Sequence, residues 1–148
     1  MTYAAFRSIG AYIPPKIMTN ADFEKIIDTS DEWITKRTGI KERRISEVDE
    51  ASSDLGARAA KLAIERAGIA YEDVDLVICA TVTPDFLCMP STACLIAAKV
   101  GLPPVMAFDI SAACTGFVYA VSIAKAFIES GMKKNVLIVG AETYTSIL

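Results

Sequence analysis

The sequence contains no histidine. Histidine is the usual general base near neutral pH, so an enzyme built on these 148 residues uses another base or takes its histidine from residues outside them. A C-x-x-C pair is also lacking, because the four cysteines lie nine, six and twenty residues apart at Cys79, Cys88, Cys94 and Cys114. This pattern argues against a zinc site, and we expect reduced cysteines that mostly pack as small hydrophobic residues.

Long apolar runs and a basic excess are missing as well. No uncharged apolar run approaches the ~20 residues that a membrane-spanning helix needs. A net charge of −3 disfavours nucleic acid as a partner. The first ten residues lack the basic and apolar regions of a secretory signal, so we expect a cytoplasmic protein. What is present is 53% hydrophobic residues, typical of a globular chain, and a mean hydropathy of +0.38 that predicts a surface partly covered by another subunit or domain.

Predicted strands and helices alternate along the chain. We expect strands over 3–13, 75–82, 105–110 and 135–141, helices over 21–28, 30–37, 53–67, 91–100 and 112–129, and an extended arm over 40–46. Asn20 and Ser53 are the expected caps of two of the helices, and Thr29 with Glu32 forms an expected capping box for a third. The alternation predicts an α/β layered fold with a mostly parallel sheet.

The helix predicted over 112–129 carries no charged residue from Ala112 to Ala124. A helix that is apolar on all sides is typical of a core position. Small side chains at Ala113, Gly116 and Ala120 would let another helix approach closely. We therefore expect this helix to lie at the centre of a body larger than 148 residues.

Cys114 lies where the strand over 105–110 turns into that helix. A thiol at a helix N-terminus lies near the positive end of the helix dipole and near unpaired N–H groups, which favour the nucleophilic thiolate. The same N–H groups can hold a developing oxyanion. The alternative is a buried structural cysteine, which is also how we interpret Cys79 and Cys94.

Three stretches of the chain resemble β-ketoacyl-acyl-carrier-protein synthase III. The segment DISAACTGFVYAVSIAKAFIESG resembles the active-site segment of that family, with Cys114 at the nucleophile position. The segment TNADFEKIIDTSDEWITKRTGIKERRI resembles its N-terminal signature, and TPDFLCMPSTACLIAAKVGL resembles its dimer-proximal loop and helix. The resemblance implies the thiolase-like layered fold (αβαβα), with residues 1–148 as one N-terminal domain and the C-terminal half of the family absent.

The resemblance also implies a reaction. Acetyl-CoA, as a substrate and not a cofactor, would acylate Cys114, and malonyl-acyl-carrier protein would then decarboxylate and condense to give acetoacetyl-acyl-carrier protein. Splitting one difficult step into two is the rationale for covalent catalysis. The implied partners are the acyl carrier protein and a second copy of the chain in a homodimer, without nucleic acid, membrane or metal.

Further site residues follow from the same resemblance. Trp33 matches the tryptophan that stacks on the CoA adenine, Arg37 and Thr38 match positions beside the CoA phosphates, and Thr29 lies on the same rim. The alternative for Trp33 is that it only packs its helix against the fold, and the alternative for Arg37 is that it is a solvated surface residue. Met89 stands where many members have phenylalanine closing the partner's acyl pocket, and ordinary loop packing is its alternative.

The family's second half supplies a histidine and an asparagine for decarboxylation, so we expect the 148 residues alone to lack condensation activity. One rival hypothesis is another thiolase-fold acyltransferase, of the polyketide synthase, hydroxymethylglutaryl-CoA synthase or thiolase type. The other is a non-catalytic half that serves dimerisation or binding. A generic nucleotide-binding domain is disfavoured because no G-x-G-x-x-G motif or P-loop follows a strand.

Overall fold

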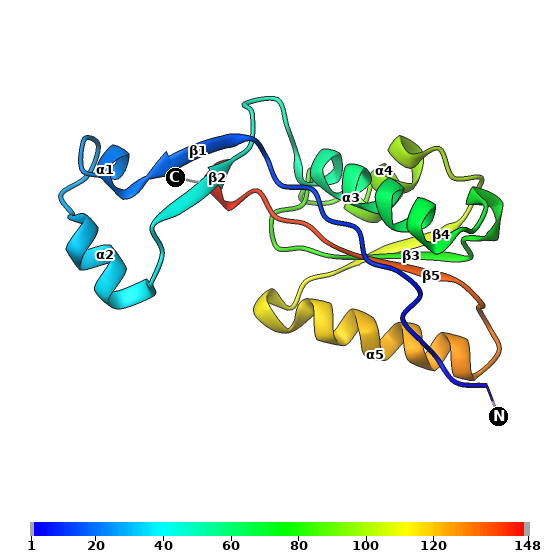
Figure 1. Cartoon of the computed structure of the whole chain (residues 1–148). Helices are drawn as coiled ribbons and strands as arrows, with labels where there is room; N and C mark the ends of the chain where they lie inside the picture. The colour runs from blue at the N-terminus through cyan, green and yellow to red at the C-terminus, as the bar shows by residue number, and fades with distance from the viewer. Residues whose placement is uncertain (1, 147–148) are drawn as a thin grey trace.

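A computed structural model describes residues 2–146 of the chain. Its main body is a three-stranded parallel sheet with helices on both faces (Figure 1). The strands are β3 (Leu76–Ala80), β4 (Met106–Ile110) and β5 (Val136–Gly140), in the order β4-β3-β5. Helices α3 (Ser52–Ala67) and α4 (Thr92–Val100) cover one face and α5 (Gly116–Glu129) covers the other. Three short 3₁₀ turns are η1 (Tyr71–Asp73), η2 (Ala113–Thr115) and η3 (Tyr144–Ser146).

Strand β3 is the centre of the core, because it is the middle strand and all five of its residues are buried. Val77 and Cys79 face the cluster beneath α3 and α4, and Leu76 and Ile78 face the cluster beneath α5. Burial on both faces explains the continuous apolar run from which the sequence predicts this strand. The predicted layered α/β class and the buried state of Cys79 are confirmed.

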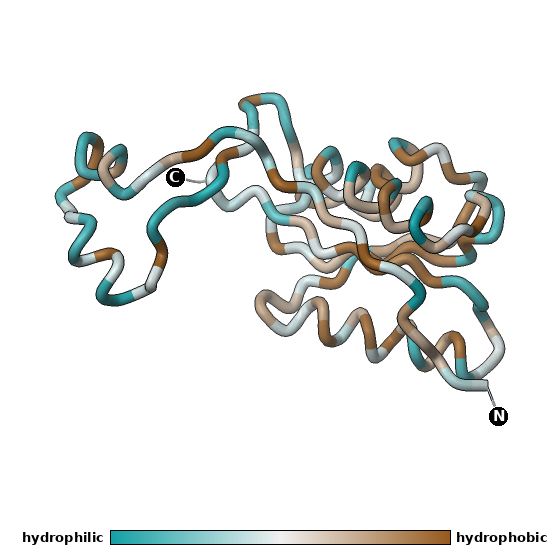
Figure 2. The backbone as a smooth tube through the Cα atoms, viewed as in Figure 1, coloured by the Kyte–Doolittle hydropathy of each residue, from teal (hydrophilic) through white to brown (hydrophobic). Residues whose placement is uncertain are grey.

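A projection, residues 14–46, extends away from the sheet (Figure 1). Its elements are β1 (Lys16–Thr19), α1 (Asn20–Phe23), α2 (Asp31–Thr38) and β2 (Glu42–Ile45), with β1 and β2 paired antiparallel. Figure 2 shows a mostly hydrophilic trace here, in contrast to the apolar strands of the sheet. The expected extended arm is thus one strand of a hairpin whose other strand, β1, the sequence did not predict.

The predicted caps in the projection are wrong by one residue. Thr19, not Asn20, caps α1, in a reciprocal pair with Asp22. Ser30, not Thr29, caps α2, because its hydroxyl accepts the N–H of Trp33. Each cap has the extended backbone that places its oxygen over the first turn. Likewise Ser53 lies inside α3, whose N-cap position is occupied by Ala51.

The strand predicted over 3–13 is also wrong, since no residue from 2 to 13 is in a strand. A strand needs a hydrogen-bonded neighbour, and here the segment is held by α3 instead. Ser8 Oγ donates to the carbonyl of Ala63 at 2.6 Å, and Arg66 donates to the carbonyl of Ile9 at 2.8 Å. A side chain on Gly10 would overlap the α3 backbone, so glycine permits this close approach.

Helix α5 is not enclosed on all sides by the described residues. Gly116, Ala120 and Ala124 are buried against the sheet, whereas Val118 is 62% exposed and Tyr119 is 52% exposed. Burial of the outer face within a larger body stays a prediction. Cys94, expected to be packed, is exposed on α4. Among residues 2–146, no helix is long and apolar enough to span a membrane.

Asp75 closes the edge of the sheet at which the strands begin. Its carboxylate accepts the N–H groups of Lys134 and Asn135 at 2.7 and 2.9 Å, and these bonds hold the pKa of Asp75 below its ordinary value of 3.8. A lowered pKa contributes stability that is present above the ordinary value and is lost as the pH falls through the lowered one. We therefore expect the stability difference between wild type and Asp75→Asn, from urea unfolding, to shrink on acidification. A difference that is constant with pH would contradict this.

Candidate active site

The loops that follow the three parallel strands meet at one edge of the sheet. Thr81 N–H donates to the carbonyl of Ile110 at 3.1 Å, and Ala141 N–H donates to the carbonyl of Ala80 at 3.4 Å. The carboxyl ends of parallel strands are where α/β folds place their reactive groups. Figure 1 shows that this edge faces the projection.

Cys114 lies at this edge, in the turn between β4 and α5. The preceding residue, Ala113, has a φ of +45°, the only positive φ outside glycine among the described residues. A left-handed alanine is disfavoured, and such residues cluster at functional turns. The N–H and hydroxyl of Thr115 both donate to the carbonyl of Ala112, at 3.1 and 2.8 Å, and fix the turn. A side chain on Gly116 would lie 3.3 Å from Ala80 Cβ, so glycine brings the turn close to β3.

The Cys114 thiol is exposed rather than packed inside the body. It sits in η2, two residues before α5 begins at Gly116. An exposed thiol near the start of a helix can be reached by a substrate. The described residues do not bury Cys114, and its catalytic role stays a prediction.

Glu142 is a residue of this edge that the sequence did not single out. Its carboxylate follows β5 and accepts the N–H groups of Val82 and Thr83, at 3.0 and 3.2 Å, together with the Thr83 hydroxyl. Glu142 thus clamps the loop after β3 to the loop after β5. An acidic residue directly after an apolar strand was the available signal.

Met89 is 77% exposed in the loop that connects β3 to α4. Each end of the loop is held by a carboxylate. Asp85 accepts the N–H of Ser53 at 2.9 Å, and Asp109 in β4 accepts the N–H groups of Thr92 and Ala93, both at 2.7 Å. Asp109 also belongs to the strand that leads to Cys114, so it connects the loop to the turn that holds Cys114. The sequence did not predict this role, although an acidic residue within an otherwise apolar strand is a recognisable signal.

Trp33 and Arg37 lie one turn apart on α2. Trp33 is 55% exposed, and the Arg37 guanidinium stacks on its ring at 4.7 Å. Thr38 is different, because its hydroxyl donates to the carbonyl of Ile34 at 2.7 Å and accepts the N–H of Ile40 at 3.1 Å. It therefore closes the end of α2. Thr29 lies beside the cap at the opposite end of the helix.

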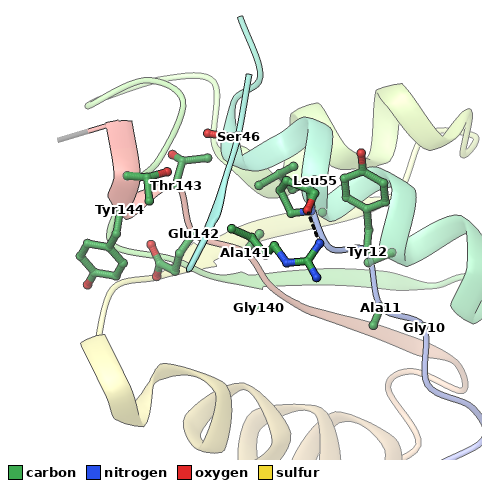
Figure 3. A pocket seen from close by; sticks show the side chains of 15 residues that line it. Gly10, Ala11, Tyr12, Ser46, Leu55, Gly140, Ala141, Glu142, Thr143 and Tyr144 are labelled. Atoms are coloured by element: carbon green, nitrogen blue, oxygen red, sulfur yellow. Dashed lines mark hydrogen bonds between the residues drawn. The ribbon is translucent and has the colours of Figure 1, made fainter. Parts of the chain in front are cut away.

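A cavity of about 410 Å³ lies between the base of the projection and the end of β5 (Figure 3). Its lining includes Tyr12, Arg44, Leu55 and the segment from Gly140 to Thr145. Neither Cys114 nor Trp33 lines this cavity. Within residues 2–146, no cluster of cysteine, aspartate and glutamate could hold a metal ion.

Comparison with known proteins gives consistent results. The model of the 3-oxoacyl-[acyl-carrier-protein] synthase III family matches residues 108–148. A β-ketoacyl-[acyl-carrier-protein] synthase III from Aliarcobacter butzleri is 84% identical over 148 residues, which are 100% of this chain and 44% of that protein. The chain thus spans less than half the length of the curated relatives that it matches.

Solved structures agree in fold. The 3-oxoacyl-[acyl-carrier-protein] synthase III of Aquifex aeolicus superposes with a TM-score of 0.91 and 51% identity, over 98% of this chain and 46% of that one. A priming β-ketosynthase of a polyketide pathway superposes with a TM-score of 0.92 and 38% identity, over 97% and 43%. The class is therefore an α/β chain with half of the thiolase-like condensing-enzyme fold. Within that class, the chain is similar over its whole length to β-ketoacyl-acyl-carrier-protein synthase III proteins.

Proposed function

We propose that the chain is the N-terminal, nucleophile-bearing domain of an initiating condensing enzyme of fatty acid synthesis. The observation that carries the proposal is the exposed Cys114 thiol on a left-handed turn at the carboxyl edge of a parallel sheet. The family's reaction needs a thiol that an acyl thioester can reach. Acetyl-CoA is the proposed acyl donor, and malonyl-acyl-carrier protein is the proposed second substrate.

In the first step, the Cys114 thiolate attacks the acetyl carbonyl, the carbon–sulfur bond of acetyl-CoA breaks, and CoA leaves as its thiolate. In the second, malonyl-acyl-carrier protein loses carbon dioxide, and its α-carbon attacks the acetyl-Cys114 carbonyl. Acetoacetyl-acyl-carrier protein leaves and the Cys114 thiolate is restored. The 148 residues hold no histidine, so we expect decarboxylation to depend on groups beyond them.

The CoA would enter over the projection. The indole of Trp33 offers a flat face to the adenine, and the Arg37 guanidinium offers charge and donors to the phosphates. Because the hydroxyl of Thr38 is engaged with the backbone, its proposed contribution is to hold the end of α2. Thr29 stays a candidate for the same rim, and Met89 a candidate for the acyl pocket of a second copy in a homodimer.

The test is the mass of the intact chain after incubation with acetyl-CoA, with Cys114→Ala as the decisive variant. A second candidate function is a priming ketosynthase of polyketide synthesis, which the likeness to such an enzyme supports. To separate the two functions, the chain would be joined to the remainder of the Aliarcobacter relative and acetylated at Cys114. Extension of the acetyl group would then be compared between malonyl thioesters on fatty acid carrier proteins and on polyketide carrier proteins.

A further inference from the structure

We infer that Asn20 is a positioning residue for CoA, because its buried side-chain amide holds α2, with Trp33 and Arg37, against β2. The inference rests on the proposed function, since it assigns Asn20 to the proposed CoA rim. Asn20 touches neither substrate nor nucleophile in this proposal and acts through α2.

The projection has no apolar core of its own. Asn20, at 2% exposure, is its only buried residue, and all of residues 14–46 are described. Apolar side chains of the projection such as Ile17, Ile26 and Ile40 are exposed. Order in this segment therefore depends on polar contacts, and a buried polar group contributes only when all its partners are present.

The Asn20 side chain contacts two elements that lie 11 to 23 residues further along the chain. Its amide nitrogen donates to Asp31 Oδ1 in α2 at 2.7 Å and to the carbonyl of Ile40, just before β2, at 2.9 Å. Its amide oxygen accepts Arg43 Nη2 at 2.8 Å. A further weak contact runs from the nitrogen to the Thr35 hydroxyl at 3.4 Å. Two donors and one acceptor on one short side chain are what only a primary amide provides.

The faces of α2 explain why this hub affects the CoA rim. Asp31 and Thr35 are four residues apart, so they share the face that turns toward Asn20. Trp33 and Arg37 are offset from them by two residues, which places them on the other side of the helix. When Asn20 holds the inner face of α2 in place, the stacked indole and guanidinium are presented on the outer face. The hydrogen bond from Asn20 is also the largest contribution to the lowered pKa of Asp31.

The variant Asn20→Asp gives a sharp test because it changes one nitrogen to oxygen. The new oxygen would face two acceptors, Asp31 Oδ1 and the Ile40 carbonyl, and could donate to one of them only when protonated. Arg43, and Lys41 at 3.4 Å from Asp31, favour the ionised form, whereas the Asp31 carboxylate opposes it. We expect a disturbed α2 at about pH 8 and a restored one at about pH 5.

Trp33 is the only tryptophan in the chain, so its emission reports on α2 alone. We would titrate CoA into wild type, Asn20→Asp and Asn20→Ala while following that emission at both pH values. If α2 is ordered in only about a tenth of the Asn20→Asp molecules, the Kd for CoA rises about tenfold at about pH 8. It should return toward wild type at about pH 5, whereas Asn20→Ala should stay weak at both. The control is Asn135→Asp, at a distant half-buried asparagine, which should leave Trp33 unaffected.

Each result decides something. Wild-type affinity and emission in both Asn20 variants would overturn the positioning role. Loss of the whole fold by far-ultraviolet circular dichroism at both pH values would also overturn it, since the inference confines Asn20 to the projection. If the emission of wild-type Trp33 does not respond to CoA, the proposed CoA rim is wrong. In that case the pH-dependent Trp33 emission of Asn20→Asp still decides whether Asn20 orders α2.

Discussion

Incubation with acetyl-CoA is expected to add one acetyl group to the wild-type chain and none to Cys114→Ala. Cys88, Cys94 and Cys114 are all exposed, so simple exposure would let all three react. Cys114 alone sits on a left-handed turn at the start of a helix that follows a parallel strand. Donors near a helix start stabilise the oxyanion formed during attack, and loss of one such donor costs about 100-fold or more in rate.

Cys94→Ala and Cys88→Ala are the matched controls, and both should still accept one acetyl group. The measurement is intact mass with peptide mapping of the modified residue. Acetylation that follows Cys94 or Cys88 instead would contradict the nucleophile assignment. If the chain stays unmodified alone but reacts when joined to the remainder of the Aliarcobacter relative, the oxyanion donors lie in that remainder.

The second large effect is expected at Asp109. Removing its carboxylate in Asp109→Ala leaves the N–H groups of Thr92 and Ala93 without acceptors, and both residues are fully buried, so water cannot replace it. We expect a loss of about 2–3 kcal/mol in the free energy of unfolding, from the two charge-assisted hydrogen bonds to the first turn of α4. Because β4 leads directly to the nucleophile turn, acetylation of Cys114 should also slow, about tenfold.

Asp75→Ala is the control for this result. Asp75 also accepts two backbone N–H groups, at the opposite edge of the sheet. Urea unfolding should show a loss of stability in both variants, smaller in Asp75→Ala because Lys134 is exposed and water can reach its N–H group. Only Asp109→Ala should acetylate more slowly. Equal acetylation rates in the two variants would mean that Asp109 stabilises the fold without positioning Cys114.

Patterns within one element were predictable from the sequence. The apolar run of β3 reflects burial at its own positions, and the glycine after α4 reflects the backbone conformation at its own position. The sheet strands and helices α3, α4 and α5 could therefore be placed closely. The exact caps were harder, because Thr29 and Ser30 are adjacent and have similar hydroxyls. Which of the two covers the first turn is decided by backbone direction, and that backbone is extended at Ser30.

By itself, the sequence determined the α/β class, the resemblance to a family and the place of Cys114 between a strand and a helix. These depend on local periodicity and on motifs that are contiguous in the chain. The roles of Asn20, Asp109 and Glu142 were decided only by the tertiary structure, because their partners lie between 11 and 60 residues away. A polar side chain has no preferred partner in sequence, and its partner is set by which backbone groups folding leaves buried or unpaired beside it.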